Sequence, residues 1–227
     1  LNGRYYLYHS PLPALIAYLP YRALFGAYPA DKYAALFFAL WAFLSAVIFA
    51  RGTGMWVLFL GLGGLVPFLL ADVRTYEIAI LAGSAMTSTW AISLLRFLGS
   101  PSRSRAVWMG VWLALVIAAR PNLIVLLLIA ILVLRRHWKL AIWTLLPLII
   151  TAASMLAYNM ARFHDPFEFG ETYQLTGVQM SGHMVCGIRN VPELIRFGSN
   201  FVHYVFWPIS LVPEFPFVQP HYSRLDP

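Results

Sequence analysis

Residues 33–50 read YAALFFALWAFLSAVIFA, and residues 140–158 read LAIWTLLPLIITAASMLAY. Both runs are continuously apolar and do not alternate between apolar and polar residues, so they predict helices rather than strands. The hydrocarbon core of a bilayer is about 30 Å thick, and a helix therefore needs about 20 mostly apolar residues to cross it. Each run has about that length, which indicates that the chain crosses a membrane.

The composition of the whole chain supports the same class of protein. Of its 227 residues, 60% are hydrophobic and 11% are charged, and the mean hydropathy is +0.71. An average soluble domain has about 25% charged residues, so this chain has too few charges to cover the surface of a soluble enzyme. Apolar residues this abundant also exclude a disordered chain. We therefore predict an all-α fold, a polytopic transmembrane helical bundle.

The apolar segments predict the number of spans and the organisation of the chain. Six candidate spans are present: 33–50, 55–71, 77–98, 107–119, 122–134 and 140–158. We expect residues 1–32 to be the end of an outer loop with an interfacial helix, and residues 33–158 to be the bundle, with Asp31 as the N-cap of its first helix. Residues 159–227 are then an outer loop, with an amphipathic helix at about 191–206.

Basic residues indicate which ends of the spans face the cytoplasm. One set of loops contains seven bases and no acid: Arg51, Arg96, Arg103, Arg105, Arg135, Arg136 and Lys139. Lys and Arg concentrate in short cytoplasmic loops, so this set is expected to face inward and all nine acids outward. The outer side also has nine bases, so the net charge of +7 belongs to the inner side. The basic composition then reflects topology and contact with membrane lipids, and nucleic acid is excluded as a partner.

Two outer turns contain the charges of greatest chemical interest. Residues 71–77 include Asp72, Arg74 and Glu77, and Arg120 lies in a turn between two apolar runs of 13 residues. Thirteen helical residues span about 20 Å. The Arg120 turn is therefore expected to lie in a recess, unless both helices extend into the inner loop. Its guanidinium could bind a phosphate in bidentate fashion, or reach the interface or pair with a carboxylate, and these interpretations stay open.

The residues after the last span include types that bind divalent metals. They are His164, Asp165, Glu168 and Glu171. Their spacing matches no strong metal motif, so a solvated loop is the simpler interpretation. We assign no metal ligand and no certain cofactor, and leave a divalent metal as an open alternative.

Three short motifs carry a family resemblance. They are Arg4-Tyr5-Tyr6 with the prolines of residues 11–20, the turn Ala118-Ala119-Arg120-Pro121, and residues 162–170. In this order they resemble GT-C fold glycosyltransferases, a group of polytopic enzymes that includes protein mannosyltransferases and bacterial aminoarabinose transferases. The first motif is similar to the end of their first outer loop. The second is similar to their turn of small residues, a base and a proline.

The resemblance implies an enzyme that moves a sugar from a polyprenyl-phosphate donor to an acceptor on the outer face of a bacterial plasma membrane. It also implies an acidic residue in the first outer loop, which serves as a general base or metal ligand. The chain begins beyond that position, at Leu1 rather than Met. We therefore expect a fragment that lacks the N-terminal span and this acid, and that is inactive alone.

The candidate site residues have defined roles in such an enzyme. Arg120 or Arg74 would bind the donor phosphate and stabilise the developing charge. Glu77 or Asp72 would deprotonate the acceptor. Candidates for contact with the substrate are Tyr5, Tyr6, Tyr76 and Asn122. Two other functions stay open, namely a multi-pass transporter or lipid flippase, and a non-catalytic membrane scaffold. The near absence of ionisable residues within the spans argues against an ion-coupled transporter.

Overall fold

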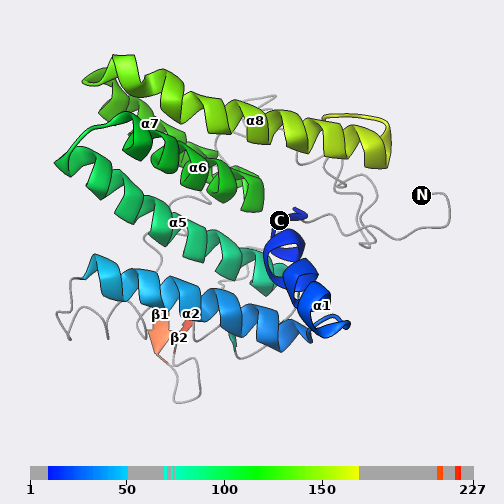
Figure 1. The fold of residues 1–227 in the computed structure, drawn as a ribbon. Coiled ribbons are helices and arrows are strands. Elements are labelled where there is room, and N and C mark those ends of the chain that lie inside the picture. The colour runs from blue at the N-terminus through cyan, green and yellow to red at the C-terminus, as the bar shows by residue number, and fades with distance from the viewer. Residues whose placement is uncertain are drawn as a thin grey trace, which may run out of the picture. The chain divides into compact units, whose positions relative to one another are not determined.

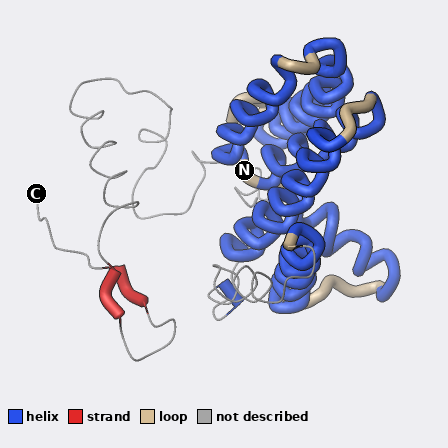
Figure 2. Tube along the Cα trace, turned by 90° about the vertical axis from the view of Figure 1, so that its left-hand side faces the viewer, coloured by secondary structure: helices blue, strands red, loops and turns tan. Residues whose placement is uncertain are grey.

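The computed structural model describes residues 10–50, 69–70, 73, 75–168, 209–211 and 218–220. The chain divides into two units, Leu1–Gln174 and Leu175–Pro227. The elements described in the first unit are all helical (Figure 1). In the second unit, β1 (Ile209–Leu211) pairs with β2 (Val218–Pro220) in antiparallel fashion (Figure 2). The expected all-α fold is thus confirmed for the described part of the first unit, whereas the strand pair was not predicted.

Four long helices of the first unit pack side by side (Figure 1). Their order across the layer is α2 (Asp31–Phe49), α5 (Thr75–Gly99), α6 (Arg103–Ala119) and α8 (Trp138–Phe163). The short helices η2 (Pro121–Val125) and α7 (Leu126–Arg135) connect α6 to α8. Because the connections at residues 100–102 and 136–137 are short, α5 and α6 run in opposite directions, as do α7 and α8.

Three helices are long and apolar enough to cross a membrane: Asp31–Phe49, Tyr76–Gly99 and Trp138–Phe163. The last of these exposes most of its apolar side chains, and its buried residues are Thr144, Asn159 and Phe163. An apolar surface of this extent suits contact with lipid better than contact with water. Both α6, with 17 residues, and Pro121–Arg135 are shorter. All of the predicted span 55–71 except residues 69–70 lies outside the described residues, so the structure supports a membrane location without establishing six spans.

Small residues bring the helices of the layer close together. Alanines such as Ala35 and Ala82 are fully buried in the core. At the contact of α6 with α8, a Cβ atom added to Gly110 would lie 2.8 Å from the Cα of Thr144. The Thr144 hydroxyl donates a buried hydrogen bond of 3.1 Å to the carbonyl oxygen of Ala106. Glycine at position 110 therefore permits both the backbone contact and the hydrogen bond between the helices.

Polar side chains join α2 to α5 within the apolar layer. Trp41 Nε1 donates a hydrogen bond of 2.9 Å to Thr89 Oγ1, and the Ser45 hydroxyl lies 3.2 Å from the same oxygen. Thr89 in turn donates to the carbonyl oxygen of Ala85 at 2.9 Å. Hydrogen bonds between helices in an apolar environment fix how far one helix is shifted along the other.

The helices extend beyond their predicted ranges, most clearly α6 and α8. α6 begins at Arg103 rather than at residue 107, because the Ser102 side chain accepts a hydrogen bond of 3.4 Å from the Arg105 backbone N–H as an N-cap. α8 continues to Phe163 rather than ending at residue 158, and stops at His164, whose φ of 60° is left-handed. The helix therefore continues past residue 158, the predicted end of the last span, because polar residues in the last turns do not interrupt it.

The predicted helix in residues 1–32 is present as η1 (Ala14–Tyr18) and α1 (Leu19–Phe25). The expectation that Asp31 caps α2 is wrong, because Ala30 occupies the N-cap position and Asp31 is the first helical residue. The Asp31 carboxylate instead accepts a hydrogen bond of 2.6 Å from the Tyr18 hydroxyl. Burial, together with this hydrogen bond, raises the pKa of Tyr18 above its usual range. The amphipathic helix expected at 191–206 lies outside the described residues.

Candidate functional site

The two ends of the helix layer differ in charge. The starts of α2 and α5 and the end of α8 lie on the same side in Figure 1. All the acids in the described part of the chain belong to this side, which we call the acidic end: Asp31, Glu77, Asp165 and Glu168. The opposite side, the basic end, contains six described bases: Arg96, Arg103, Arg105, Arg135, Arg136 and Lys139. The candidate site lies toward the acidic end.

Arg120 is placed by the turn that ends α6. Its backbone N–H still donates a hydrogen bond of 3.0 Å to the carbonyl oxygen of Val116, but its φ of −143° and ψ of 99° are extended. This conformation is expected because the proline that follows disfavours a helical backbone at the preceding residue. Pro121 then begins η2. Its missing N–H costs nothing there, because the first N–H groups of a helix have no acceptor within the helix. The sequence Arg-Pro therefore turns the chain sharply and directs the Arg120 side chain away from the α6 axis.

The Arg120 side chain crosses α5 at Gly83 and ends beside Tyr76. A Cβ atom on Gly83 would lie 2.9 Å from Arg120 Cγ, so the absence of a side chain makes room for the crossing. Arg120 Nη2 donates a hydrogen bond of 3.2 Å to the Tyr76 hydroxyl, and Cζ lies 4.9 Å from the centre of the Tyr76 ring. A hydrogen bond and a cation–π contact thus hold the same guanidinium.

The recess was predicted from two runs of 13 residues, but α6 begins earlier, at Arg103, and the helices after the turn continue to Arg135, so the helix lengths do not establish a recess. Gly83 is eight residues after the start of α5, which corresponds to about 12 Å along the helix. The Cγ and Cδ atoms of Arg120 therefore lie beside the third turn of α5. The guanidinium extends from there toward Tyr76 in the first turn. Among the described residues, the hydrogen-bond partner of the Arg120 guanidinium is the Tyr76 hydroxyl, and Asp72, a possible carboxylate partner, lies outside them.

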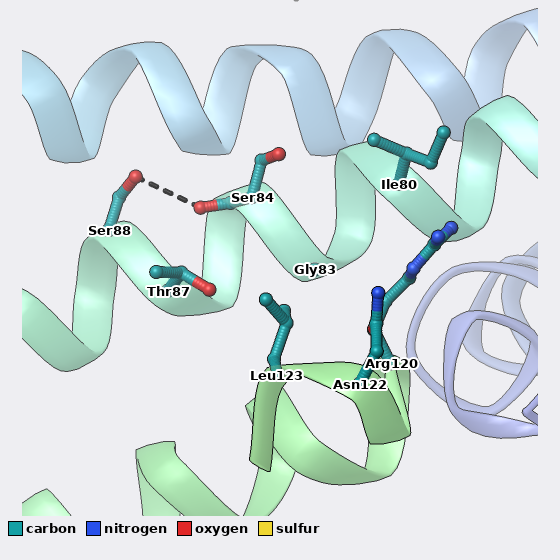
Figure 3. Close-up of a pocket in the computed structure, with 8 residues that line it drawn as sticks. All are labelled: Ile80, Gly83, Ser84, Thr87, Ser88, Arg120, Asn122 and Leu123. Atoms are coloured by element: carbon teal, nitrogen blue, oxygen red, sulfur yellow. Dashed lines mark hydrogen bonds between the residues drawn. The ribbon is translucent and has the colours of Figure 1, made fainter. Parts of the chain in front are cut away.

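A pocket of about 560 Å³ lies between α5 and the turn after α6 (Figure 3). One face of α5 provides Ile80, Gly83, Ser84, Thr87 and Ser88, and the turn provides Arg120, Asn122 and Leu123. Residues three and four apart share one helix face, so the five α5 residues form a continuous wall. The volume is in the range of sites that bind small molecules, about 300–1,000 Å³.

Two hydroxyl groups of this wall differ in their hydrogen bonding. Ser88 donates a hydrogen bond of 2.9 Å to the carbonyl oxygen of Ser84, as the dashed line in Figure 3 shows. Thr87 Oγ1 is buried and has no hydrogen-bond partner in the described part of the protein. The protein encloses this oxygen, so the part of Thr87 that borders the pocket is not its hydroxyl.

The structure brings together some of the predicted site residues. Tyr76 and Arg120 are in contact, and Asn122 lines the same pocket as Arg120. Glu77 lies in the first turn of α5, half-buried, and is not among the described residues that line the pocket. Four other candidates lie outside the described residues: Tyr5, Tyr6, Asp72 and Arg74.

The pocket wall on α5 was not predicted as part of the site. Small residues in a membrane helix ordinarily serve close helix packing, so those of segment 77–98 gave no reason to expect a site there. Their spacing contained a further signal, because Gly83, Ser84, Thr87 and Ser88 recur at intervals of three and four residues. This pattern places a notch and three hydroxyls on one helix face. Nothing in the sequence shows that this face meets the Arg120 turn.

Of the possible metal ligands after α8, Asp165 has a structural role. Asp165 Oδ1 accepts a hydrogen bond of 2.8 Å from the backbone N–H of Phe167, and Asn159 Nδ2 donates one of 3.2 Å to the carbonyl oxygen of Pro166. These contacts form the turn that follows the helix. Among the described residues, no group of three His, Cys, Asp or Glu side chains is close enough together to hold a metal ion. Glu171 lies outside that part of the chain.

The arrangement at Arg120 can bind an anion at a defined depth. The guanidinium is oriented by Tyr76 and adjoins a pocket with both hydroxyl and apolar walls. A ligand with an anionic group next to a polar, uncharged group would match these features. No family model, no curated protein and no solved structure matches this chain.

Proposed function

We propose that the protein is an integral-membrane glycosyltransferase, built on a bundle of six spans, that uses a polyprenyl-phosphate-linked sugar donor. The sugar moves to an acceptor on the outer face of a bacterial plasma membrane. The observation that carries the proposal is the oriented Arg120 guanidinium beside a pocket of about 560 Å³ at the acidic end. The family resemblance of the Arg120-Pro121 turn agrees with this assignment.

The location of Arg120 suits a phosphate at the end of a lipid chain. A polyprenyl phosphate keeps its chain in the hydrocarbon and its phosphate near the headgroups, so a cation for it must lie just below the membrane surface. With the start of α5 at the outer membrane surface, as the proposal requires, the Arg120 stem lies about 12 Å below that surface and its guanidinium returns toward Tyr76. Three helices long enough to cross a membrane are consistent with a lipid substrate.

The proposed reaction is a single displacement at the anomeric carbon. An acceptor oxygen forms a bond to that carbon while its proton moves to a carboxylate, for which Glu77 or Asp72 is the candidate. The bond between the anomeric carbon and the phosphate oxygen breaks, and its electron pair leaves with the polyprenyl phosphate. Arg120 stabilises the negative charge that develops on the leaving oxygen, which lowers the barrier. Tyr76 keeps the guanidinium in place through the hydrogen bond of 3.2 Å.

The proposal predicts that Arg120→Ala abolishes sugar transfer in the full-length protein while leaving membrane insertion unchanged. Loss of a guanidinium that stabilises the leaving group is expected to lower kcat by at least about 100-fold. The measurement is transfer of radiolabelled sugar from the lipid donor, with membrane content determined by immunoblot. Arg22→Ala is the matched control, because Arg22 is another base at this end and contacts Tyr28 instead.

Other outcomes of this assay separate the alternatives. Wild-type turnover in Arg120→Ala would remove Arg120 from the site. Movement of the donor lipid between the two leaflets without sugar transfer would favour a flippase. Absence of both donor binding and donor movement in the purified wild-type protein would favour a scaffold.

A further inference from the structure

The basic end of the helix layer is a surface where several segments meet. The His137 ring packs edge-on against the buried Phe97 ring, with the ring centres 5.6 Å apart, so the connection between α7 and α8 contacts the end of α5. The Arg103 guanidinium lies 5.7 Å from the centre of the Trp143 ring, which joins the start of α6 to α8. The bases of both short connections therefore belong to one surface (Figure 1).

Most of the described bases at this end have no task within the fold. Arg105 is the exception, because its Nη1 donates hydrogen bonds of 2.9 Å and 3.0 Å to the carbonyl oxygens of Arg96 and Ser100 at the end of α5. Five other bases have exposed side chains: Arg96, Arg103, Arg135, Arg136 and Lys139. The described acids all lie at the acidic end, so no described carboxylate neutralises this charge.

The charges of this surface are unfavourable for the helices that contain them. α6 and α8 both begin at the basic end, and neither has an acid in its first turn. Arg103 lies in the first turn of α6, and Lys139 lies in the first turn of α8. The start of a helix has a positive partial charge, which disfavours cations, and neighbouring bases also repel one another. An anionic partner would offset both effects.

Exposed tryptophans indicate the kind of partner that carries this anion. Trp138, in the first turn of α8, is 71% exposed, and Trp108, in the second turn of α6, is 56% exposed. Tryptophan concentrates at the level of the lipid headgroups, where its ring meets the hydrocarbon and its N–H meets water. Ile142, one turn after Trp138, is also exposed. A water-soluble polyanion would leave these apolar groups in water, whereas a phospholipid provides both an anion and acyl chains.

We propose that the basic end binds an anionic phospholipid of the leaflet that it faces, in preference to a zwitterionic one. The headgroup contacts the exposed bases, and the acyl chains lie beside Trp138 and Trp108. Arg103 is suited to the phosphate, because a guanidinium that lies over an indole ring is already oriented and keeps its N–H donors for paired bonds to oxygen. The inference does not depend on the proposed function, because the Arg120 pocket lies toward the acidic end.

The test measures the affinity of two short-chain lipids for the detergent-purified full-length protein by isothermal titration calorimetry. One probe is dioctanoyl phosphatidylglycerol, which is anionic, and the other is dioctanoyl phosphatidylcholine, which has the same chains and no net charge. The parent protein contains Arg120→Gln, so that the proposed donor site does not bind the probe phosphate. We expect the anionic lipid to bind at least about tenfold more tightly. The difference should shrink in about 1 M salt, where the screening length is about 3 Å.

Two double variants of this parent locate the site. Arg103→Gln with Arg136→Gln removes one base from each short connection, and should weaken phosphatidylglycerol about 30-fold, which corresponds to about 1 kcal/mol for each base. Its affinity for phosphatidylcholine should not change. Arg22→Gln with Lys32→Gln is the matched control, because it removes two exposed bases with cation–π contacts from the acidic end. This control should bind both lipids as the parent does.

Several outcomes would overturn the inference. They are equal affinity of the parent for the two lipids, no loss in Arg103→Gln with Arg136→Gln, and an equal loss in the control, which would show a response to net charge alone. Glycerol phosphate that binds as tightly as phosphatidylglycerol would assign the surface to a soluble anion. If the first double variant does not fold, as judged by its melting temperature, Arg135→Gln with Lys139→Gln should show the same loss. None of these results alters the proposed function, which is tested at Arg120.

Discussion

Among single residues, Gly83 determines where the Arg120 side chain can lie. A methyl group at this position would be 2.9 Å from Arg120 Cγ, an atom near the base of the side chain that cannot move without moving the guanidinium. Gly83→Ala is therefore expected to separate Arg120 from Tyr76 and to weaken binding of a bare polyprenyl phosphate about tenfold. Isothermal titration calorimetry of the purified protein measures this affinity.

Gly99→Ala is the matched control for this prediction, because Gly99 is in the same helix and a Cβ there would meet nothing within 4 Å. Gly83→Ala, in the helix interior, gains up to about 1 kcal/mol in helix propensity, whereas Gly99 is the last residue of α5 and gains less, so the comparison of the two variants rests on phosphate affinity. Wild-type phosphate affinity in Gly83→Ala would show that the crossing does not position the guanidinium.

The sequence identified Arg120 and Tyr76 as separate candidates but not as partners. They are 44 residues apart and belong to different helices, and no short-range pattern links such positions. Their contact follows from the packing of α5 against α6 and from the notch at Gly83. Asp31 shows a similar limit, because its residue type suits an N-cap. The backbone of Ala30, with φ of −66° and ψ of 147°, places the cap one residue earlier.

Among the elements, α6 and α8 approach each other most closely where Gly110 meets the backbone of Thr144. A Cβ on Gly110 would lie 2.8 Å from Thr144 Cα and 2.9 Å from Thr144 C, and these backbone atoms can move only if the whole helix moves. Gly110→Ala should therefore separate the helices, break the Thr144–Ala106 hydrogen bond and lower stability by about 1–3 kcal/mol. Thermal unfolding in detergent, followed by circular dichroism, measures the change.

Phosphate binding provides a contrast between Gly110→Ala and Gly83→Ala. The Gly110 contact involves α8, whereas the described pocket residues come from α5 and from the turn after α6. The folded fraction of Gly110→Ala should therefore keep its phosphate affinity while its melting temperature falls. An unchanged melting temperature would mean that the two backbones separate easily and that the contact contributes little.

The helices themselves were predictable to the extent that they are apolar. The predicted segments 33–50, 77–98 and 140–158 overlap α2, α5 and α8, because continuous apolar runs indicate membrane helices well. The ends were less accurate, since helical hydrogen bonding continues through polar residues such as those of residues 159–163. The strands β1 and β2 were not predicted, because three residues per strand give too short a pattern.

In the first unit taken as a whole, the sequence predicted the separation of charge between the two ends, and the helix directions agree with it. Short basic connections at residues 100–102 and 136–137 join helices on one side, while the described acids lie on the other. Each helix of about 20 residues takes the backbone from one end of the layer to the other. Successive loops therefore alternate between the two ends, and bases and acids that alternate along the sequence are separated in space. The Arg120 pocket opens between helices whose acidic end, by the positive-inside rule, would face outward.

This orientation predicts opposite labelling of the two ends. Cys186 is the single cysteine, so a Cys186→Ser background allows one cysteine to be placed at a time. Ala27→Cys, at an exposed site before α2, should react with a membrane-impermeant maleimide in intact cells. Ser104→Cys, at an exposed site in the first turn of α6, should react only after the membrane is opened.

The reverse labelling pattern would place the basic end outside and the Arg120 pocket on the cytoplasmic side. A donor phosphate in the outer leaflet would then lie a full bilayer thickness, about 30 Å, from the guanidinium. Arg120 could still bind a lipid phosphate in the inner leaflet, so its phosphate affinity would survive, whereas sugar transfer on the outer face would not. Orientation and binding are therefore separate requirements of the proposed reaction, and the labelling experiment tests the first without depending on the second.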